Sequence, residues 1–343
     1  MGGDMTWKRG TVVTVLALLV SGCGVLSSKA DRQRAQELAD AVHPGELRVV
    51  GARKLFPETT GSEVTFALRG DPDAFVRLRV DAGDDRCGGL PCAQALRDAR
   101  RQGEAAAAEW RAMKAEFADC GYEVHAATVS RGAVTDPWIA HALTDDNVTD
   151  VLARIGDCLE SYSRSLPAGQ TAGRTSMTVH IAHPSTVRGL PAGREDEPTL
   201  VRKTRRKLGA ALAGRASYAV TYAWREGVVR PETGTARIVL PFEERQKFND
   251  RVHASTSEWL RSKHPDAKVS RVYGGAWTLR PGRVDRMRGW VLFCKGPEEQ
   301  EKRCLGNHAL AVTVDAKGRL TGEPAVVENV REGRGALRLP PLD

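Results

Sequence analysis

The seven cysteines are the feature that most constrains how this chain of 343 residues can fold. Cys23 stands apart, directly after the short apolar segment 11–20, and the other six lie between residues 87 and 304. An odd number of cysteines leaves at least one outside any disulfide. The pairing of the other cysteines therefore depends on the role of the N-terminal segment that contains Cys23.

The first 23 residues have the layout of an export signal. Lys8 and Arg9 precede residues 11–20, which are too few to cross a bilayer core of about 30 Å as a helix but suit a secretory signal. They lead into Val20-Ser21-Gly22-Cys23, an aliphatic residue followed by two small residues and a cysteine. This pattern resembles the lipobox of bacterial lipoproteins. The alternative is an ordinary signal peptide followed by a chance cysteine.

The resemblance implies a location and a covalent modification. Residues 1–22 would be removed as a signal peptide, and Cys23 would become an acylated N-terminus that carries diacylglycerol and palmitate. Residues 23–30 would then tether the protein to the extracytoplasmic face of the cell membrane. The body of the chain, with 39 Arg against 12 Lys, is similar in general character to uncharacterised secreted lipoproteins of actinobacteria. That likeness implies no activity.

Without Cys23 an even set of cysteines remains, and in an exported chain such a set predicts disulfides. Fifteen pairings are possible, and spacing favours some of them. A Gly-Gly-Leu-Pro turn separates the first two cysteines, and a charged loop between two strand-like segments separates the last two, which leaves the middle two for each other. These spacings do not match those of zinc sites. The candidates are Cys87, Cys92, Cys120, Cys158, Cys294 and Cys304.

Hydrophobic periodicity predicts an α+β fold. Alternating apolar residues indicate strands at 46–55, 63–68, 75–81, 122–130, 177–183, 218–224, 235–240, 268–279, 287–294, 308–314 and 320–327. Helical spacing indicates helices at 31–42, 92–119, 148–166, 199–212 and 241–264, the third capped by Thr144, Asp145 and Asp146. Because hairpin-like turns join many strands, we expect antiparallel sheets, each covered by long amphipathic helices.

A segment rich in Pro, Gly and charge divides the chain. Residues 185–198 are the expected linker between an N-terminal α+β module (31–184) and a C-terminal α+β module (199–343). A weak internal repeat predicts two related modules, since Glu109-Trp110 and Glu258-Trp259 align on a long helix of each; the alternative is a chance match. The architecture is similar to tandem cystatin-like or β-lactamase-inhibitor-like modules, which is an analogy of form only.

The common catalytic and cofactor motifs are absent from the sequence. His180 and His183 form an H-x-x-H pair, but on a strand these positions face opposite sides, so we predict no metal site there. We therefore predict no catalytic residue, no cofactor and no metal. The expected function is non-enzymatic binding or interaction. The alternatives are a secreted enzyme with dispersed catalytic residues, for example around His125, His141 or His180, and an inhibitor-like or sensor-like module.

One cluster of charge stands out in a chain whose formal net charge is +8. We predict that it contacts an anionic surface, either membrane lipid, an envelope polymer or another envelope protein, unless it is a solvated helix face. Nucleic acid is not an expected partner of an exported protein. The cluster comprises Arg202, Lys203, Arg205, Arg206 and Lys207.

Four tryptophans either line a glycan groove or pack in sheets, and their strand patterns favour packing: Trp138, Trp224, Trp277 and Trp290.

Overall fold

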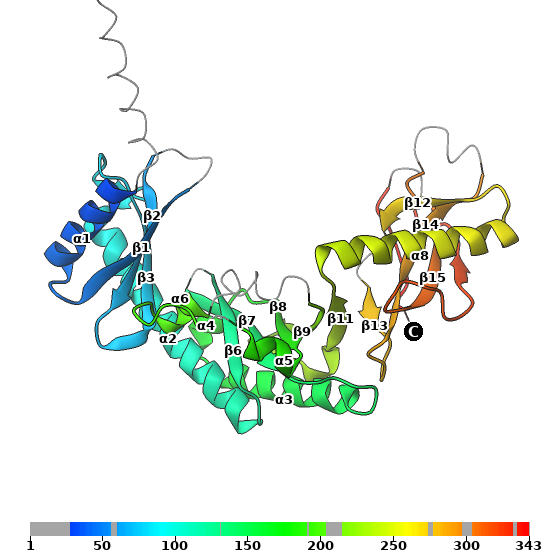
Figure 1. Ribbon diagram of the computed structural model, residues 1–343, viewed down its shortest axis with the longest axis horizontal. Coiled ribbons are helices and arrows are strands. Elements are labelled where there is room, and N and C mark those ends of the chain that lie inside the picture. Colours follow the sequence, from blue (N-terminus) through cyan, green and yellow to red (C-terminus); the bar gives the residue numbers. More distant parts are fainter. Residues whose placement is uncertain are drawn as a thin grey trace, which may run out of the picture. The chain divides into compact units, whose positions relative to one another are not determined.

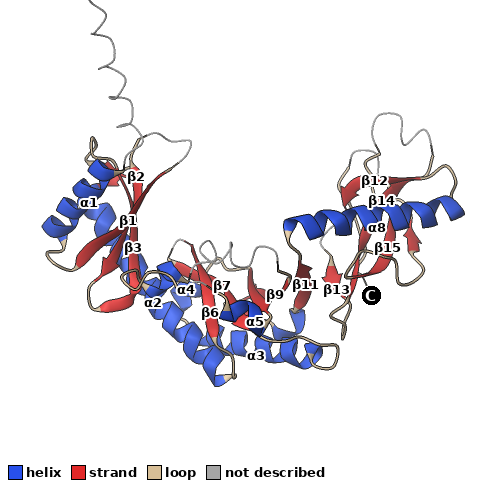
Figure 2. Cartoon of the chain, viewed as in Figure 1, coloured by secondary structure: helices blue, strands red, loops and turns tan. Residues whose placement is uncertain are grey.

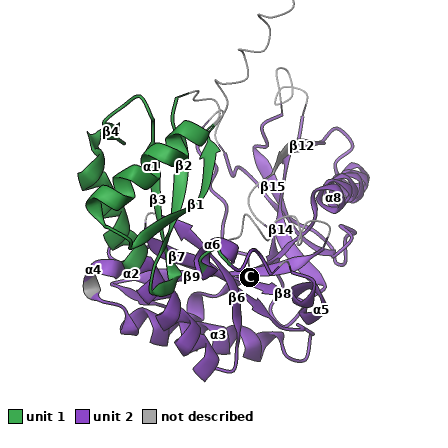
Figure 3. Cartoon of the chain, turned by 60° about the vertical axis from the view of Figure 1, so that its left-hand side comes forward, with its two compact units in different colours: residues 1–104, 196–198 green, residues 105–195, 199–343 purple. Residues whose placement is uncertain are grey.

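The computed structural model describes residues 28–55, 60–130, 132–190, 192–203, 215–273, 277–296, 304–331 and 335–342. The lipobox, Cys23 and most of the predicted tether lie outside the described residues, as do Arg205, Arg206 and Lys207. The chain divides into two compact units, which Figure 3 colours separately. Unit 1 comprises residues 1–104 and 196–198, and unit 2 comprises 105–195 and 199–343.

Unit 1 is a small antiparallel sheet with helical cover (Figure 1). Val64 and Phe66 of β2 share one core with Ala35 of α1 and Leu96 of α2, so both helices pack on the same face of the sheet. A short hairpin, β4 with β5, precedes α2. The elements are α1 (Lys29–Val42), β1 (Leu47–Lys54), β2 (Ser62–Leu68), β3 (Asp71–Val80), β4 (Arg86–Cys87), β5 (Leu90–Pro91) and α2 (Cys92–Asp119), which continues into unit 2.

Asp31 ties the start of α1 to the sheet. Its carboxylate is 4% exposed and accepts hydrogen bonds from Ser62 Oγ at 2.5 Å, from Lys54 Nζ at 2.9 Å and from the Ala82 backbone N–H at 2.9 Å. Burial raises the pKa of this carboxyl, but the three hydrogen bonds together outweigh burial and hold the pKa below its ordinary value of 3.8. The ionised side chain therefore links α1 with β1, β2 and the turn after β3.

Asp31→Asn is expected to destabilise unit 1 at neutral pH by on the order of 1 kcal/mol, and the effect should fade in acid. Because the folded pKa is depressed, the stabilisation is present above the unfolded value near 4 and is lost as the pH falls through the folded pKa. Hydrogen exchange of the β1 and β2 amides, corrected for intrinsic pH dependence, measures this between pH 3 and pH 6. Asp40→Asn, an exposed change on the same helix, is the control. A penalty that is equal at both pH values would contradict the account.

The first sheet of unit 2 carries one parallel pair. Its strands run in the order β10-β9-β8-β7-β6, with β11 paired to β9, and β7 and β8 are parallel while the other pairs are antiparallel. Helix α3 packs closely here: Tyr222 Oη donates to the Leu152 carbonyl at 2.6 Å, and a Cβ on Gly156 would lie 2.9 Å from Pro231. The elements are β6 (Val124–Ser130), β7 (Ala133–Ala140), α3 (Val148–Ser165), α4 (Ala168–Thr171), β8 (Ser176–Ala182), α5 (Pro184–Arg188), α6 (Thr199–Arg202), β9 (Ser217–Arg225), β10 (Val228–Val229), η2 (Pro231–Thr233) and β11 (Thr235–Val239).

The second sheet of unit 2 lies beside α8, as Figure 2 shows. Its order is β12-β14-β15-β16, all antiparallel, with β13 paired to β14. Trp290 and Leu292 of β14 belong to a core that Leu337, Leu339 and Leu342 of the C-terminal segment pack against. The elements are α8 (Phe242–Lys263), β12 (Lys268–Tyr273), β13 (Thr278–Leu279), β14 (Arg286–Cys294), β15 (His308–Asp315) and β16 (Ala325–Val327).

The predicted α+β class with antiparallel sheets is confirmed, and some details of the strand prediction are wrong. Strand β7 lies between the strands expected at 122–130 and 177–183, where the sequence predicts no strand. Between the pairs Ala126–Trp138 and Thr128–Thr135, β7 holds one residue more than β6, and Asp136 has a φ of 50°. This bulge accommodates a proline that a regular central strand excludes. The single strand expected at 268–279 is instead divided between β12 and β13, and of the strand expected at 320–327 only the last three residues form β16.

The compact units fall elsewhere than the modules expected at 31–184 and 199–343. Strand β8 lies before the expected linker and β9 after it, yet they pair from Ser176 to Ile181 of β8 within one unit. The aligned pairs also differ in environment, since Glu109 and Trp110 are buried whereas Glu258 is exposed.

The six paired cysteines form the three disulfides that their spacing favoured, Cys87–Cys92, Cys120–Cys158 and Cys294–Cys304. The second joins the end of α2 to α3. The third links the end of β14 to the segment that leads into β15, as expected for a bridged hairpin.

The predicted cap of α3 is wrong. The N-cap residue is Asn147 rather than Thr144, Asp145 or Asp146, and the Asn147 side chain accepts a hydrogen bond from the Thr144 N–H instead of capping the helix. Asp145 is drawn away because its carboxylate pairs with Arg283 at 2.7 Å and accepts from the Val284 N–H at 2.8 Å.

Candidate functional site

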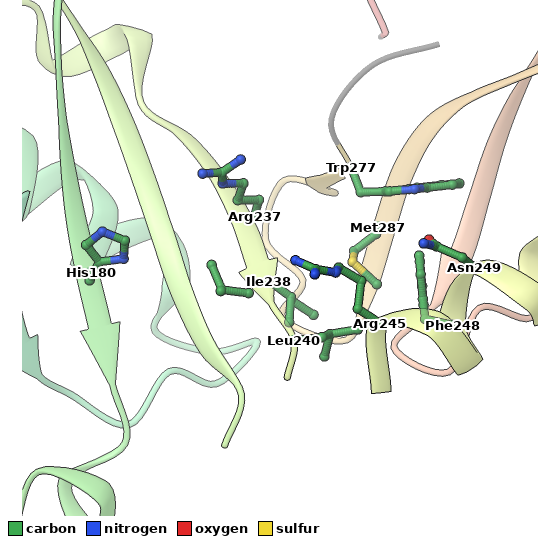
Figure 4. Close-up of a pocket in the computed structure, with 10 residues that line it drawn as sticks. His180, Arg237, Ile238, Leu240, Arg245, Phe248, Asn249, Trp277 and Met287 are labelled. Atoms are coloured by element: carbon green, nitrogen blue, oxygen red, sulfur yellow. The ribbon is translucent and has the colours of Figure 1, made fainter. Parts of the chain in front are cut away.

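A cavity of about 310 Å³ lies in unit 2, where residues from β8, the β11 segment, α8, β14 and Trp277 converge. We call it the β11–α8 cavity. Figure 4 shows Arg237, Ile238 and Leu240 along the β11 segment, with Phe248, Asn249, Trp277 and Met287 across from them. Its lining residues in the described part of the chain are His180, Arg237, Ile238, Val239, Leu240, Arg245, Phe248, Asn249, Trp277 and Met287.

Strand register places two of the polar groups. His180 of β8 and Arg237 of β11 are both paired with Ala219 of the strand between them, β9. Side chains at directly paired positions stand on the same face of a sheet, so these three form one row. The short Ala219 side chain leaves space between the imidazole and the arginine. Trp138 extends the row on β7, where its ring stacks on His180 with centroids 4.3 Å apart.

Helical spacing brings three lining residues to one face of α8. Arg245, Phe248 and Asn249 are three or four residues apart, so they project from the same side. Phe248 is buried and fixes this side of the helix against the second sheet. Arg245 and Asn249 are thereby placed at the cavity with a guanidinium and an amide.

The indole of Trp277 forms the aromatic wall. It meets the Phe248 ring edge-on, with centroids 5.4 Å apart and planes at 89°. It also lies against β14 at Gly289, where a Cβ would be only 2.6 Å from the ring. Glycine at this position therefore leaves room for the indole. Buried Met287 adds a polarisable apolar surface.

The charged groups of the cavity are arginines. Arg237 and Arg245 are both exposed, and among the described residues neither guanidinium has an ion-pair or hydrogen-bond partner. Arg245 lies 5.5 Å from the centroid of the exposed Phe242 ring. No acidic side chain is among the described residues that line the cavity. Both cations are thus available to an anionic group.

The histidines singled out by the sequence are dispersed in the structure. His180 lines the cavity, while His183 precedes α5, where its Nδ1 accepts from the Ser185 N–H at 3.3 Å. His125 lies near Glu123 at 3.4 Å, and burial lowers the pKa of this imidazole below its ordinary value. His141 meets Tyr122 edge-on. Of His125, His141 and His180, only His180 is among the lining residues.

Two residues of the basic cluster lie in the described part of the chain, and both pack against neighbouring residues. Arg202 and Lys203 are half-buried at the end of α6, and the Lys203 carbonyl accepts a hydrogen bond from the Ala127 N–H of β6 at 3.1 Å. A Cβ on Gly193 would lie 2.8 Å from the Arg202 side chain. These two side chains are therefore less available to a surface than the sequence suggested.

Three side chains that carry no recognisable sequence signal form a buried polar triad. Glu109 of α2 is 2% exposed and accepts hydrogen bonds from Tyr162 Oη of α3 and from Arg174 at 2.6 Å. Burial and the neighbouring Glu109 carboxylate raise the pKa of Tyr162 well above its ordinary value. The Arg174 guanidinium lies over the Trp224 ring, with its Cζ atom 5.1 Å from the ring centroid. The charges are too buried to meet a ligand, so the triad joins elements of unit 2.

No protein-family model, no curated protein and no solved structure matches this chain. Among the residues described, no group of three or more His, Cys, Asp or Glu side chains is placed to hold a metal ion. Within the same residues, no helix has both the length and the apolar character to cross a membrane.

Proposed function

We propose that the protein is a lipid-anchored, extracytoplasmic binding protein that holds a small ligand in the β11–α8 cavity. The single observation that carries the binding role is the cavity itself, whose lining combines an aromatic wall with two arginines that have no ion-pair or hydrogen-bond partner among the described residues. Ligand sites typically combine an apolar lining with a few convergent polar groups in volumes from about 300 Å³ upward. The lipobox resemblance at Val20–Cys23 supports the anchor, and three disulfides suit an oxidising compartment.

The chemistry of the lining favours binding over catalysis. Guanidinium and amide groups orient and neutralise a ligand, whereas acid–base or nucleophilic catalysis needs a reactive group close to a partner that activates it. His180 is the lining residue with suitable acid–base chemistry, and its ring is stacked on Trp138.

The basic cluster supplies a second, weaker contact with anionic lipid or envelope polymer. That contact rests mainly on Arg205, Arg206 and Lys207, at about 1 kcal/mol per charge near an anionic surface.

Cys23→Ser is expected to move the protein from the membrane fraction to the soluble extracytoplasmic fraction and to abolish labelling with radioactive palmitate. The reason is that the thioether-linked lipid has no other attachment point, and two or more acyl chains are needed for firm anchoring. Fractionation of cells that express the full chain measures the distribution.

Ser21→Ala is the matched control, because it keeps a small residue in the lipobox and should leave both anchoring and labelling intact. Membrane retention and palmitate labelling of the Cys23→Ser variant would contradict the anchor.

A further inference from the structure

We propose that the β11–α8 cavity selects small aromatic carboxylates, that is, a planar apolar body of one or two rings bearing one anionic group. This inference rests on the proposed function and names the ligand class of the same cavity. It follows from the two kinds of side chain that the cavity holds on different elements: cations on β11 and α8, and rings on α8 and beside β13.

The anionic end of the ligand is assigned to Arg237 and Arg245. Each guanidinium offers several N–H donors in a planar fork, which matches the two oxygens of a carboxylate. Neither arginine has a partner of its own among the described residues, and no described acidic side chain lines the cavity to compete with a ligand. Arg245 reaches from α8 toward the β11 side in Figure 4, so the two cations approach the cavity from different elements.

The aromatic end is assigned to Trp277, Phe248 and Met287. Phe248 and Trp277 already form an edge-to-face pair, and a further ring would extend this arrangement. Met287 adapts its shape to flat ligands. A cavity of about 310 Å³ is at the small end of ligand sites, which limits the body to one or two rings.

Gly289 is the residue that positions the aromatic wall. Because a Cβ at this position would lie only 2.6 Å from the Trp277 ring, Gly289→Ala must displace the indole, and neither arginine is among the atoms nearest to the added methyl group. The anionic and aromatic parts of the site can thus be perturbed separately.

The test uses two probes of the same shape, 2-naphthoate and the uncharged 2-naphthamide, titrated calorimetrically into the full chain in detergent. We expect 2-naphthoate to bind at least tenfold more tightly than 2-naphthamide. Arg237→Gln and Arg245→Gln should each weaken naphthoate about tenfold and leave naphthamide unchanged, since a hydrogen bond to a charged group is lost. Arg261→Gln, an exposed change on the same helix, is the control and should alter neither.

The aromatic arm uses Gly289→Ala, which should weaken both probes about equally. Trp277→Leu adds no atom to β14 and should have the same effect, so it serves if the alanine variant does not fold. Equal affinity of both probes, or naphthoate binding that is insensitive to both arginine changes, would overturn anion selection while leaving a binding cavity. Binding of neither probe would overturn the ligand class. In each case the Cys23→Ser fractionation reports on anchoring independently.

Discussion

Replacing Glu109 by alanine is expected to lower the free energy of unfolding of unit 2 by about 3–5 kcal/mol, because it leaves a buried guanidinium without its counter-charge. Arg174 is 11% exposed at its side chain and pairs with a carboxylate that is 2% exposed. Tyr162, which is fully buried, would lose its acceptor as well. The penalty combines an unpaired charge and an unsatisfied hydroxyl in a low-dielectric site.

Urea unfolding followed by tryptophan fluorescence measures this loss. Every tryptophan after the predicted signal peptide lies beyond residue 104, so the signal reports on unit 2. Glu116→Ala on the same helix removes a surface hydrogen bond from Ser161 Oγ and should cost about 1 kcal/mol or less. Similar midpoints for the Glu109 and Glu116 variants would show that the triad does not stabilise the unit. Glu109→Gln should fall between them, because the amide still accepts from Tyr162.

Removing the Cys120–Cys158 disulfide by double substitution to alanine is the second large effect, with an expected loss of about 4 kcal/mol. The bridge spans 38 residues and joins α2 to α3, so its absence releases a long loop in the unfolded chain. The Cys294–Cys304 bridge spans 10 residues, and the same chain-entropy argument gives about 3 kcal/mol for it.

Both double variants are compared with the wild type by the same fluorescence titration. The variant that lacks the Cys120–Cys158 bridge, which closes the longer loop, should show the larger shift in its unfolding midpoint. A thiol assay on the unreduced, denatured protein should find no free thiol beyond position 23, and two free thiols in this region would sink the three-bridge assignment. A reversed order of the two variants would mean that local packing, rather than loop length, decides the contribution.

Much of the secondary structure follows from local pattern. The helix expected at 92–119 and the one expected at 148–166 both occur, since each carries an apolar stripe long enough to fix its period. Strand β7 could not be predicted, because Asp136-Pro137 is a turn signal and only the bulge opposite β6 makes a strand possible there. The predicted cap of α3 is wrong for a similar reason: Asp145 pairs with Arg283, which is 138 residues away in the sequence.

Less of the candidate site could be predicted from the sequence. From the sequence, Trp277 is predicted either to pack in a sheet or to line a glycan groove; in the structure its indole packs on Gly289 of β14 and also lines the cavity. Arg237 carried no signal, because an arginine on an alternating strand is typical of a solvent face. Its significance arises only from the row that β8, β9 and β11 create, which depends on strand pairing across the segment 183–216.

Helix α2 has a practical consequence for dissecting this molecule. Its 28 residues form one continuous helix, of which residues up to 104 belong to unit 1 and the rest to unit 2. A fragment cut at the unit boundary would contain half a helix, about 13 to 15 residues, and isolated helices of that length are marginal in water. Expression fragments for either unit should therefore keep residues 92–119 whole. Limited proteolysis should likewise spare this segment, although it lies where a linker between two separable domains would ordinarily be found.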